Sequence, residues 1–462
     1  MVKKFVDIRR LRKIRTEALP RYSRSQAPAW ERVAWRLCLP SAESIFLCLV
    51  PCVAIAMGFT SSATAANPKD VEKLLTTKAC PKCDLKDAQL AGSQLEGANL
   101  EGANLEGADL TSANLTRANL TSANLTGVKL LVANLEKATL KEAKLFAIQR
   151  RIDNKKTESV PADLRDANLK GADLFGANLN SALISGANLR EAQLRYAQLT
   201  YADLAKAKLT NANLSGANLT GAILIEAELK IANLNGANLS SARLNSATLD
   251  NAKLVSANLT SADLSKAYVG AADLNGAILI GAKLVGTTLA DTNLQSADLS
   301  GADLTDAILK GAGFNRANLS GANLTRADLT NAKLSLVNLK GADLTGANLN
   351  FAYLHTANLE TANLSGVDLR EAQMREANLT GTTLIGANLS GANLISAKLT
   401  GANLTYTNFS TADLRLANFG GANLSYANLN QANLGEANFA DAKLTGANLK
   451  EAKLTGAIGL NR

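Results

Sequence analysis

Residues 96–125 read EGANLEGANLEGADLTSANLTRANLTSANL, six consecutive five-residue units that each end on leucine. The same period runs from Leu85 to Leu145 and again from Leu164 to Leu454, which gives 72 units. The central position is Leu in 65 of them and another apolar residue in the remaining seven. A short fixed period of this kind indicates stacked structural units rather than a globular core.

Each unit alternates small, polar and large side chains: Ala, then Asn or Asp, then Leu. Ala and Leu therefore point to one side of an extended segment, and the polar residue points to the other. The alternation breaks after three residues, so the chain must turn in every unit. An α-helix is a poor alternative because a five-residue step rotates by about 140° net and scatters the leucines around the helix. The pattern predicts an all-β solenoid with Leu and Ala inside.

The tandem A(N/D)LXX pattern, which covers residues 85–145 and 164–454, resembles the pentapeptide-repeat family. The resemblance implies a right-handed quadrilateral β-helix with four pentapeptides in each 20-residue coil. The repeats would then form about 18 coils, roughly 86 Å long at about 4.8 Å per coil. Residues one coil apart should stack, so we expect two aromatic pairs: Phe419 with Phe439 inside, and Tyr406 with Tyr426 outside.

Most of the excess positive charge lies within residues 1–65. The chain carries a net charge of +9, and residues 1–65 hold 11 basic and 4 acidic residues, which leaves +2 for the rest. A long basic stretch, an apolar run over residues 45–59 and an A-x-A site at Ala63–Ala65 are typical of an export signal. The apolar run is shorter than the roughly 20 residues that span a bilayer. We expect a cleaved signal peptide over 1–65, with a retained membrane anchor as the alternative.

The expected signal indicates that the protein works outside the cytoplasm. Pentapeptide proteins with such signals resemble a cyanobacterial group, which implies the periplasm or the thylakoid lumen as the destination. If residues 1–65 are retained, the protein would be anchored to a membrane instead.

Residues 66–84 are predicted to form an N-terminal cap on the solenoid. Asn67 suits a helix N-cap, Pro68 suits the first turn, and the apolar residues that follow give a short helix one apolar face. Extending the repeat backward places Cys80 at a Leu position and Cys83 at an Ala position, so both should face the core. We favour a structural disulfide or a buried thiol pair, with redox sensing as the alternative. A zinc site needs about four ligands, so no metal site is predicted.

An insertion between Leu145 and Leu164 interrupts the five-residue period. Residues 146–163 are predicted to leave the solenoid as a surface loop. One interpretation is a tolerated surface insertion. The other is a projection that binds a partner through four exposed basic side chains: Arg150, Arg151, Lys155 and Lys156.

Residues 455–462 are predicted to form a short tail after the last repeat. A last coil without a cover would offer unpaired backbone groups and apolar side chains. We therefore expect either a homodimer through the C-terminal coil or a tail that folds back over it.

The sequence favours an interaction protein over an enzyme. It contains no phosphate-binding or nucleophile motif and no metal-spaced His cluster, and its single histidine, His355, is predicted to point outward. No cofactor and no nucleic-acid partner are predicted. We expect an exported scaffold that binds an unknown protein partner through its outer faces, including Tyr406 and Tyr426, through the inserted loop or through the C-terminal coil.

Two alternative functions belong to other classes. The first is a structural spacer, tethered to a membrane if residues 1–65 are retained. The second comes from the resemblance, because some pentapeptide proteins mimic DNA and inhibit a topoisomerase. That mimicry needs a strongly acidic surface, whereas the chain after residue 65 is near neutral.

Overall fold

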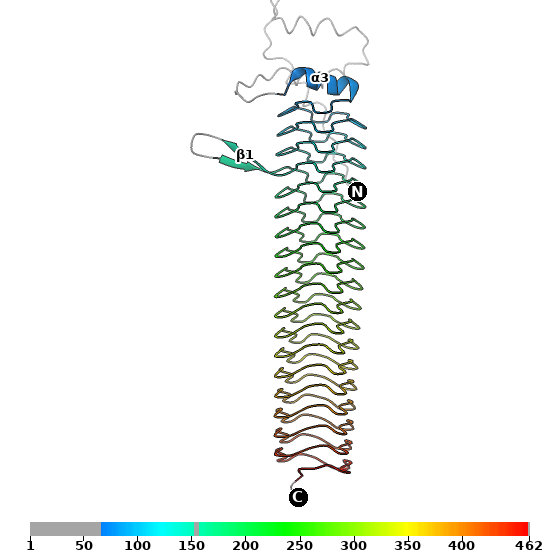
Figure 1. Ribbon diagram of the computed structural model, residues 1–462, viewed down its shortest axis with the longest axis vertical. Helices are drawn as coiled ribbons and strands as arrows, with labels where there is room; N and C mark the ends of the chain where they lie inside the picture. The colour runs from blue at the N-terminus through cyan, green and yellow to red at the C-terminus, as the bar shows by residue number, and fades with distance from the viewer. Residues whose placement is uncertain (1–65, 152–156, 461–462) are drawn as a thin grey trace, which may run out of the picture. The chain divides into compact units, whose positions relative to one another are not determined.

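The computed structural model describes residues 66–151 and 157–460. Within these residues the elements are one helix, α3 (Pro68–Thr77), and two strands, β1 (Ile148–Arg151) and β2 (Thr157–Val160). The repeats form a solenoid in which isolated parallel β-bridges join each coil to the next (Figure 1). Among the described helices, none is long and apolar enough to span a membrane. The expectations for residues 1–65 lie outside the described residues.

Backbone hydrogen bonds between successive coils set the 20-residue period. Asn104 pairs with Asn124 in a parallel bridge, and the Leu105 N–H donates to the Asn124 carbonyl at 2.7 Å. Asn124 pairs in turn with Lys144, and bridges with this spacing recur along the solenoid, so the predicted coil of four pentapeptides is confirmed. Across the insertion, Lys129 pairs with Asp163, a separation equal to one coil plus the inserted segment.

Each unit turns at the second residue after its central Leu, which we call the corner position. Around Leu85, the Ala88 N–H donates to the Leu85 carbonyl at 3.0 Å, and the corner residue Asp87 has a φ of 56°. A four-residue turn with positive φ at its third residue is typical of type II. The polar residue before Leu supports the turn, as where the Asn114 side-chain oxygen accepts from the Thr116 N–H at 3.2 Å.

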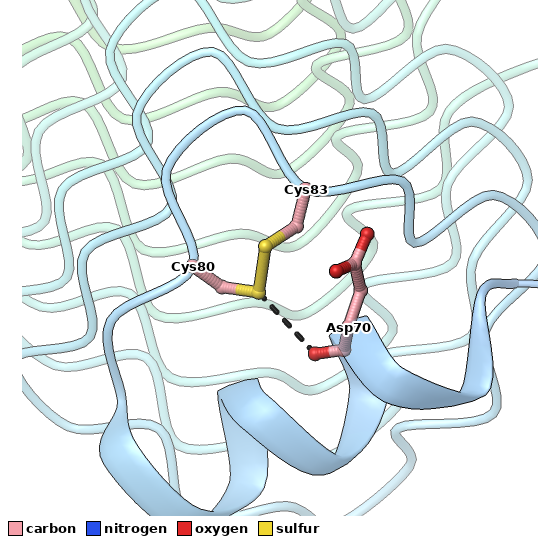
Figure 2. A group of neighbouring side chains, drawn as sticks. All are labelled: Asp70, Cys80 and Cys83. Atoms are coloured by element: carbon pink, nitrogen blue, oxygen red, sulfur yellow. Dashed lines mark hydrogen bonds between the residues drawn. A yellow bond between two sulfur atoms is a disulfide. The ribbon is translucent and has the colours of Figure 1, made fainter.

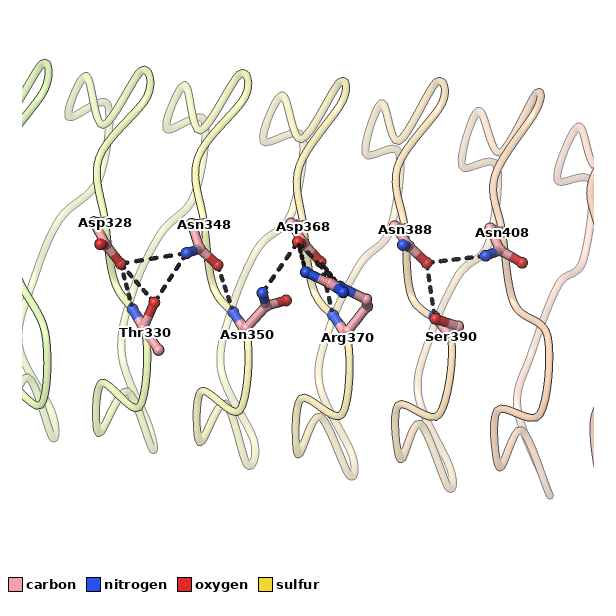
Figure 3. A network of polar contacts seen from close by, with 9 residues as sticks. All are labelled: Asp328, Thr330, Asn348, Asn350, Asp368, Arg370, Asn388, Ser390 and Asn408. Carbon is pink, nitrogen blue, oxygen red and sulfur yellow. Dashed lines mark hydrogen bonds and ion pairs between the residues drawn. The ribbon is translucent and has the colours of Figure 1, made fainter.

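The outward polar side chains also bond from coil to coil. Figure 3 shows one face, on which Asn348 donates to Asp328 at 3.4 Å and Asn408 donates to Asn388 at 3.0 Å. The same Asx oxygen accepts from a backbone N–H in its own unit, as at Asn388 and Ser390. One Asn side chain therefore stabilises both the local turn and the stacking of coils, which explains its preference at this position.

The inward side chains fill a continuous apolar core. From Leu85 to Phe439 the central residues are at most 2% exposed, and nearly all of the Ala positions are fully buried. Phe419 and Phe439 stack in this core with ring centroids 4.9 Å apart. Tyr406 and Tyr426 stack outside it at 5.1 Å. Both predicted pairs are confirmed, and they verify the 20-residue register independently of the backbone.

The helix expected after residue 66 is present as α3. The Asn67 side chain accepts from the Lys69 N–H at 3.1 Å, and Pro68 opens the first turn. Leu74 is fully buried and Val71 partly buried against the core, which places this side of α3 on the first coil (Figure 1). Leu75, which was expected on the same apolar face, is 54% exposed. The Asp70 side chain also accepts from the Asp84 N–H at 2.9 Å. These contacts attach the helix to the start of the solenoid.

Candidate interaction surfaces

The cysteine pair lies between α3 and the first coil (Figure 2). Cys80 is fully buried and Cys83 is 5% exposed, so both face the core as the register predicts. Their sulfur atoms are 2.10 Å apart, joined as a disulfide. The Cys80 sulfur also lies 3.2 Å from the Asp70 carbonyl oxygen. A disulfide sulfur carries no proton, so this is a packing contact between the disulfide and α3.

These residues also form a group that could in principle hold a metal ion. Ligand atoms of Asp70, Cys80 and Cys83 all lie within 4.8 Å of one another. Three ligands are fewer than the four of a structural zinc site, and thiolates coordinate a metal only when the disulfide is open. The arrangement therefore fits a covalent link at the first turn better than a metal centre.

The inserted segment has more order than the predicted loop. β1 and β2 pair antiparallel, with Ile148 opposite Val160 and Arg151 opposite Thr157, and they form a hairpin outside the solenoid (Figure 1). Arg150 and Arg151 are exposed, as expected. Lys155 and Lys156 lie outside the described residues. A polar sequence without clear alternation concealed this hairpin from sequence analysis.

The base of the hairpin is attached to one corner of the solenoid, at positions 87, 107 and 127. A Cβ atom added to Gly127 would lie 2.7 Å from Ile148 Cγ1, so only glycine leaves room for this side chain. Arg150 passes over Gly107 and forms an ion pair with Asp87. These contacts hold β1 against three successive coils, so the base of the hairpin does not depend on the strand pairing alone.

An open depression of about 490 Å³ adjoins this base. Its lining includes the basic residue Lys144 and the apolar side chains of Phe146 and Ile148. Where the chain returns to the solenoid, Arg165 donates to Asp163 at 2.7 Å, and this hydrogen bond lowers the pKa of the Asp163 carboxyl below its usual value. The surroundings of the hairpin therefore combine cationic, apolar and ionised acidic groups, which is a mixture suited to protein contacts.

Two pairs of outer aromatic residues are in contact with each other. Tyr406 and Tyr426 are 62% and 54% exposed. Sequence analysis did not identify a second cluster. In it, Phe175 packs edge-on against Tyr196 with ring centroids 5.8 Å apart, and the Arg195 guanidinium carbon lies 5.5 Å from the centroid of the Tyr196 ring. Phe175 and Arg195 occupy equivalent positions in successive coils, so the same register that predicted the tyrosine stack could have found them.

The last coil is less covered than the others. Leu454 and Ile458 are 36% and 60% exposed, whereas Leu444 and Leu449 are partly buried against the core. The Ile458 N–H still donates to the Ala437 carbonyl at 3.0 Å, so residues up to 458 continue the solenoid. His355 lies outside the core and is partly exposed, as predicted.

Comparison with known proteins gives relatives of the repeats. Among curated proteins, none matches the chain. Among solved structures, HetL, a pentapeptide repeat protein involved in heterocyst differentiation regulation in Nostoc sp. PCC 7120, is 42% identical over 42% of this chain and 88% of its own, with a TM-score of 0.33. A pentapeptide repeat protein from the thylakoid lumen of Arabidopsis thaliana is 28% identical over 28% of this chain and 66% of its own, with a TM-score of 0.13.

A third structure is QnrB1, described as a plasmid-mediated fluoroquinolone resistance protein. It is 22% identical over 40% of this chain and 90% of its own, with a TM-score of 0.22. All three TM-scores are low, so the assignment rests on the family model for pentapeptide repeats. That model matches overlapping segments over residues 83–145, 162–269, 272–360 and 362–458. The chain therefore belongs to the pentapeptide-repeat family, whose members fold as right-handed quadrilateral β-helices.

Proposed function

We propose that this protein is a non-enzymatic scaffold that binds a protein partner through the β1–β2 hairpin. The observation that carries the proposal is the attachment of the hairpin base to the solenoid through Ile148 and Arg150. A tolerated insertion needs no such anchoring, whereas a binding element gains affinity when its geometry is held before the partner arrives. The neighbouring depression and the exposed arginines supply apolar and cationic contacts.

We also propose that residues 1–65 direct export to the periplasm or the thylakoid lumen, with membrane anchoring as the alternative. The support is the order of basic, apolar and small residues in that segment. A spacer function would leave the anchored hairpin without a role. Topoisomerase inhibition by DNA mimicry is less favoured because the chain after residue 65 has 38 basic and 36 acidic residues.

In this proposal α3 and the Cys80–Cys83 disulfide act together as the N-terminal cap. Leu74 covers the first coil, and the disulfide closes the first turn beneath the helix. A solenoid needs such a cover because its terminal coil has no neighbour on one side. An oxidising compartment outside the cytoplasm would maintain the disulfide.

The C-terminal coil is proposed to bind a second copy of the chain. Exposed Leu454 and Ile458 and the outward backbone groups of the last coil would be buried in an end-to-end homodimer. A twofold axis would bring the same donors, acceptors and apolar side chains together from both copies.

The hairpin proposal predicts loss of one partner when the hairpin is removed. Deleting 146–159 alone would place Pro161 at a corner position with positive φ, which proline cannot adopt, so residues 146–161 are replaced by Ser-Gly. Photo-crosslinking in the cells that make the protein should give a partner that is lost in this variant and in Arg150→Glu/Arg151→Glu. The matched control Arg117→Glu should retain it. The mature N-terminus, read by mass spectrometry on the same sample, is expected near Ala66.

An unchanged crosslinked partner in the hairpin variant would contradict the proposal. Circular dichroism and thermal melting of each variant, which should match the unmodified protein, distinguish a lost contact from a lost fold.

The cap proposal predicts a local effect of reduction. A disulfide that closes a four-residue loop stabilises a protein by roughly 2 kcal/mol, and coils in a solenoid contact only their neighbours. Reductant should therefore increase hydrogen exchange in residues 66–105 and leave the coils after Leu164 unchanged. The Cys80→Leu/Cys83→Ala variant, which restores the repeat residues, should not respond to reductant. Equal loss of protection along the whole chain would exclude a local cap.

The dimer proposal predicts a change in mass with concentration. Light scattering of the unmodified chain should approach twice the monomer mass as concentration rises. The Leu454→Lys/Ile458→Asp variant should remain monomeric, because charges replace the exposed apolar side chains. The control Ile231→Lys, on an exposed corner far from the last coil, should dimerise normally. A monomer at every concentration would exclude the homodimer.

A further inference from the structure

The two stacked tyrosines leave one ring face uncovered. Side chains at corner positions lean toward the following coil: a Cβ atom added to Gly446 would lie 2.7 Å from Tyr426 Cδ1, and one added to Gly216 would meet the Tyr196 ring in the same way. Tyr406 accordingly lies over Tyr426, with the ring planes 11° apart. The opposite face of the Tyr406 ring is turned toward the preceding coil.

Gly386 occupies that preceding corner position. Its N–H donates to the Thr405 carbonyl at 3.0 Å, so it lies directly beside the backbone of Tyr406. A Cβ atom added to Gly386 would have no atom within 4 Å, and the same holds at Gly366 one coil earlier. Among the described residues, no side chain therefore fills the corner next to the free face of Tyr406, consistent with its greater exposure than Tyr426.

Two polar groups with free hydrogen-bonding capacity lie on the same coil as Gly386. Asn388, two residues after Gly386, accepts from Asn408 through its oxygen, but its Nδ2 donates to no acceptor within residues 66–151 and 157–460. The Gly386 carbonyl likewise accepts no hydrogen bond from the described residues. Carbonyls at equivalent corners are within reach of donors, since the Gln373 amide donates to the Glu371 carbonyl at 3.2 Å.

The coil of the ring and the coils directly before and after it carry no charge at this corner. Residues 383–391, 403–411 and 423–431, which form this corner and its two faces in three successive coils, contain no Asp, Glu, Lys or Arg. Charged side chains lie one coil earlier, where Asp368, the bridge partner of Asn388, forms an ion pair with Arg370 at 2.7 Å, so the two charges offset each other. A nucleic acid would need lysine or arginine to neutralise its phosphates, and a charged metabolite would need a counter-ion. The ligand indicated by these residues is polar and uncharged.

We propose that Tyr406, Gly386 and Asn388 form a binding site for a neutral oligosaccharide. A pyranose ring presents a C–H face that stacks on an aromatic ring and hydroxyl groups around its rim that both donate and accept. The Tyr406 face, the Asn388 amide and the Gly386 carbonyl supply the three matching groups on two adjacent coils.

A peptide fits this corner less well. Peptides that add to a β-structure pair with an unpaired strand edge, whereas the Leu384 and Gly386 N–H groups already donate to the next coil. The site is separate from the hairpin, so the oligosaccharide proposal stands or fails independently of the partner proposed above.

Saturation-transfer NMR on the full chain with cellohexaose, maltohexaose and chitohexaose tests the proposal. The unmodified protein should bind at least one of them, and Tyr406→Ala should weaken that binding by about tenfold or more through loss of the stacking platform. Gly386→Tyr should weaken it similarly, because a third tyrosine would cover the free face. Tyr201→Ala, which removes an exposed tyrosine on another corner, should bind as the unmodified protein does.

Four outcomes would overturn the proposal. They are no saturation transfer to any of the three sugars, unchanged affinity in both Tyr406→Ala and Gly386→Tyr, an equal loss in Tyr201→Ala, and binding at Tyr406 of a proline-rich peptide but of no sugar. Gly386→Tyr is expected to fold, because Tyr406 and Tyr426 already adopt positive φ at this corner. Thermal melting of each variant checks this.

Discussion

The structure depends on hydrogen bonding between successive coils of the solenoid. Between the two end coils, the central Leu donates its N–H to the coil that follows, and the outward Asn donates its N–H to the coil before, as at Leu105 and Asn124. These bonds hold only if every side of the coil has the same length, which is why the five-residue period tolerates no drift. The Leu and Ala side chains then stack on copies of themselves and form a narrow apolar core. The inserted hairpin respects the constraint, because the period resumes in register after it.

At the corner positions the backbone conformation is constrained, whereas the side chain is free to vary. Their backbone is left-handed, and residues as bulky as Ile231 and Phe351 adopt it, with φ of 59° and 58°. Such a conformation costs roughly 1–2 kcal/mol for a residue other than glycine, and the bonds of the neighbouring coils offset that cost. The side chains at corners point to solvent and take little part in the core. Corner residues can therefore vary without loss of the fold, and the surface features discussed above lie there: Asp87 under the hairpin, the Tyr406–Tyr426 stack and the uncovered Gly386.

Sequence periodicity was sufficient for the solenoid because its information is local and repeated. The inward cysteines followed from the five-residue period alone. The 20-residue coil came from the resemblance to the pentapeptide-repeat family, and the stacking of Phe419 on Phe439 followed from that coil length. The hairpin could not be predicted from the sequence pattern. Its strands β1 and β2 are short and mostly polar and pair with each other, so no alternation of buried and exposed residues marks them. The ion pair between Arg150 and Asp87 joins residues 63 positions apart, and no periodicity relates the two. The Phe175–Tyr196 cluster was accessible in principle through the 20-residue register but requires side-chain geometry to be recognised.

The central claim is that stability resides in whole coils that stack in register. It is tested most directly by comparing two deletions of almost equal size. Removing residues 222–281 takes out three complete coils and joins Gly221 to Ala282 in register. This protein should melt as cooperatively as the unmodified chain, and small-angle scattering should give a maximum dimension shorter by roughly 14 Å. Removing residues 222–279 leaves two extra residues at the junction and should disrupt the stacking there. Equal melting behaviour of the two deletions would contradict the account.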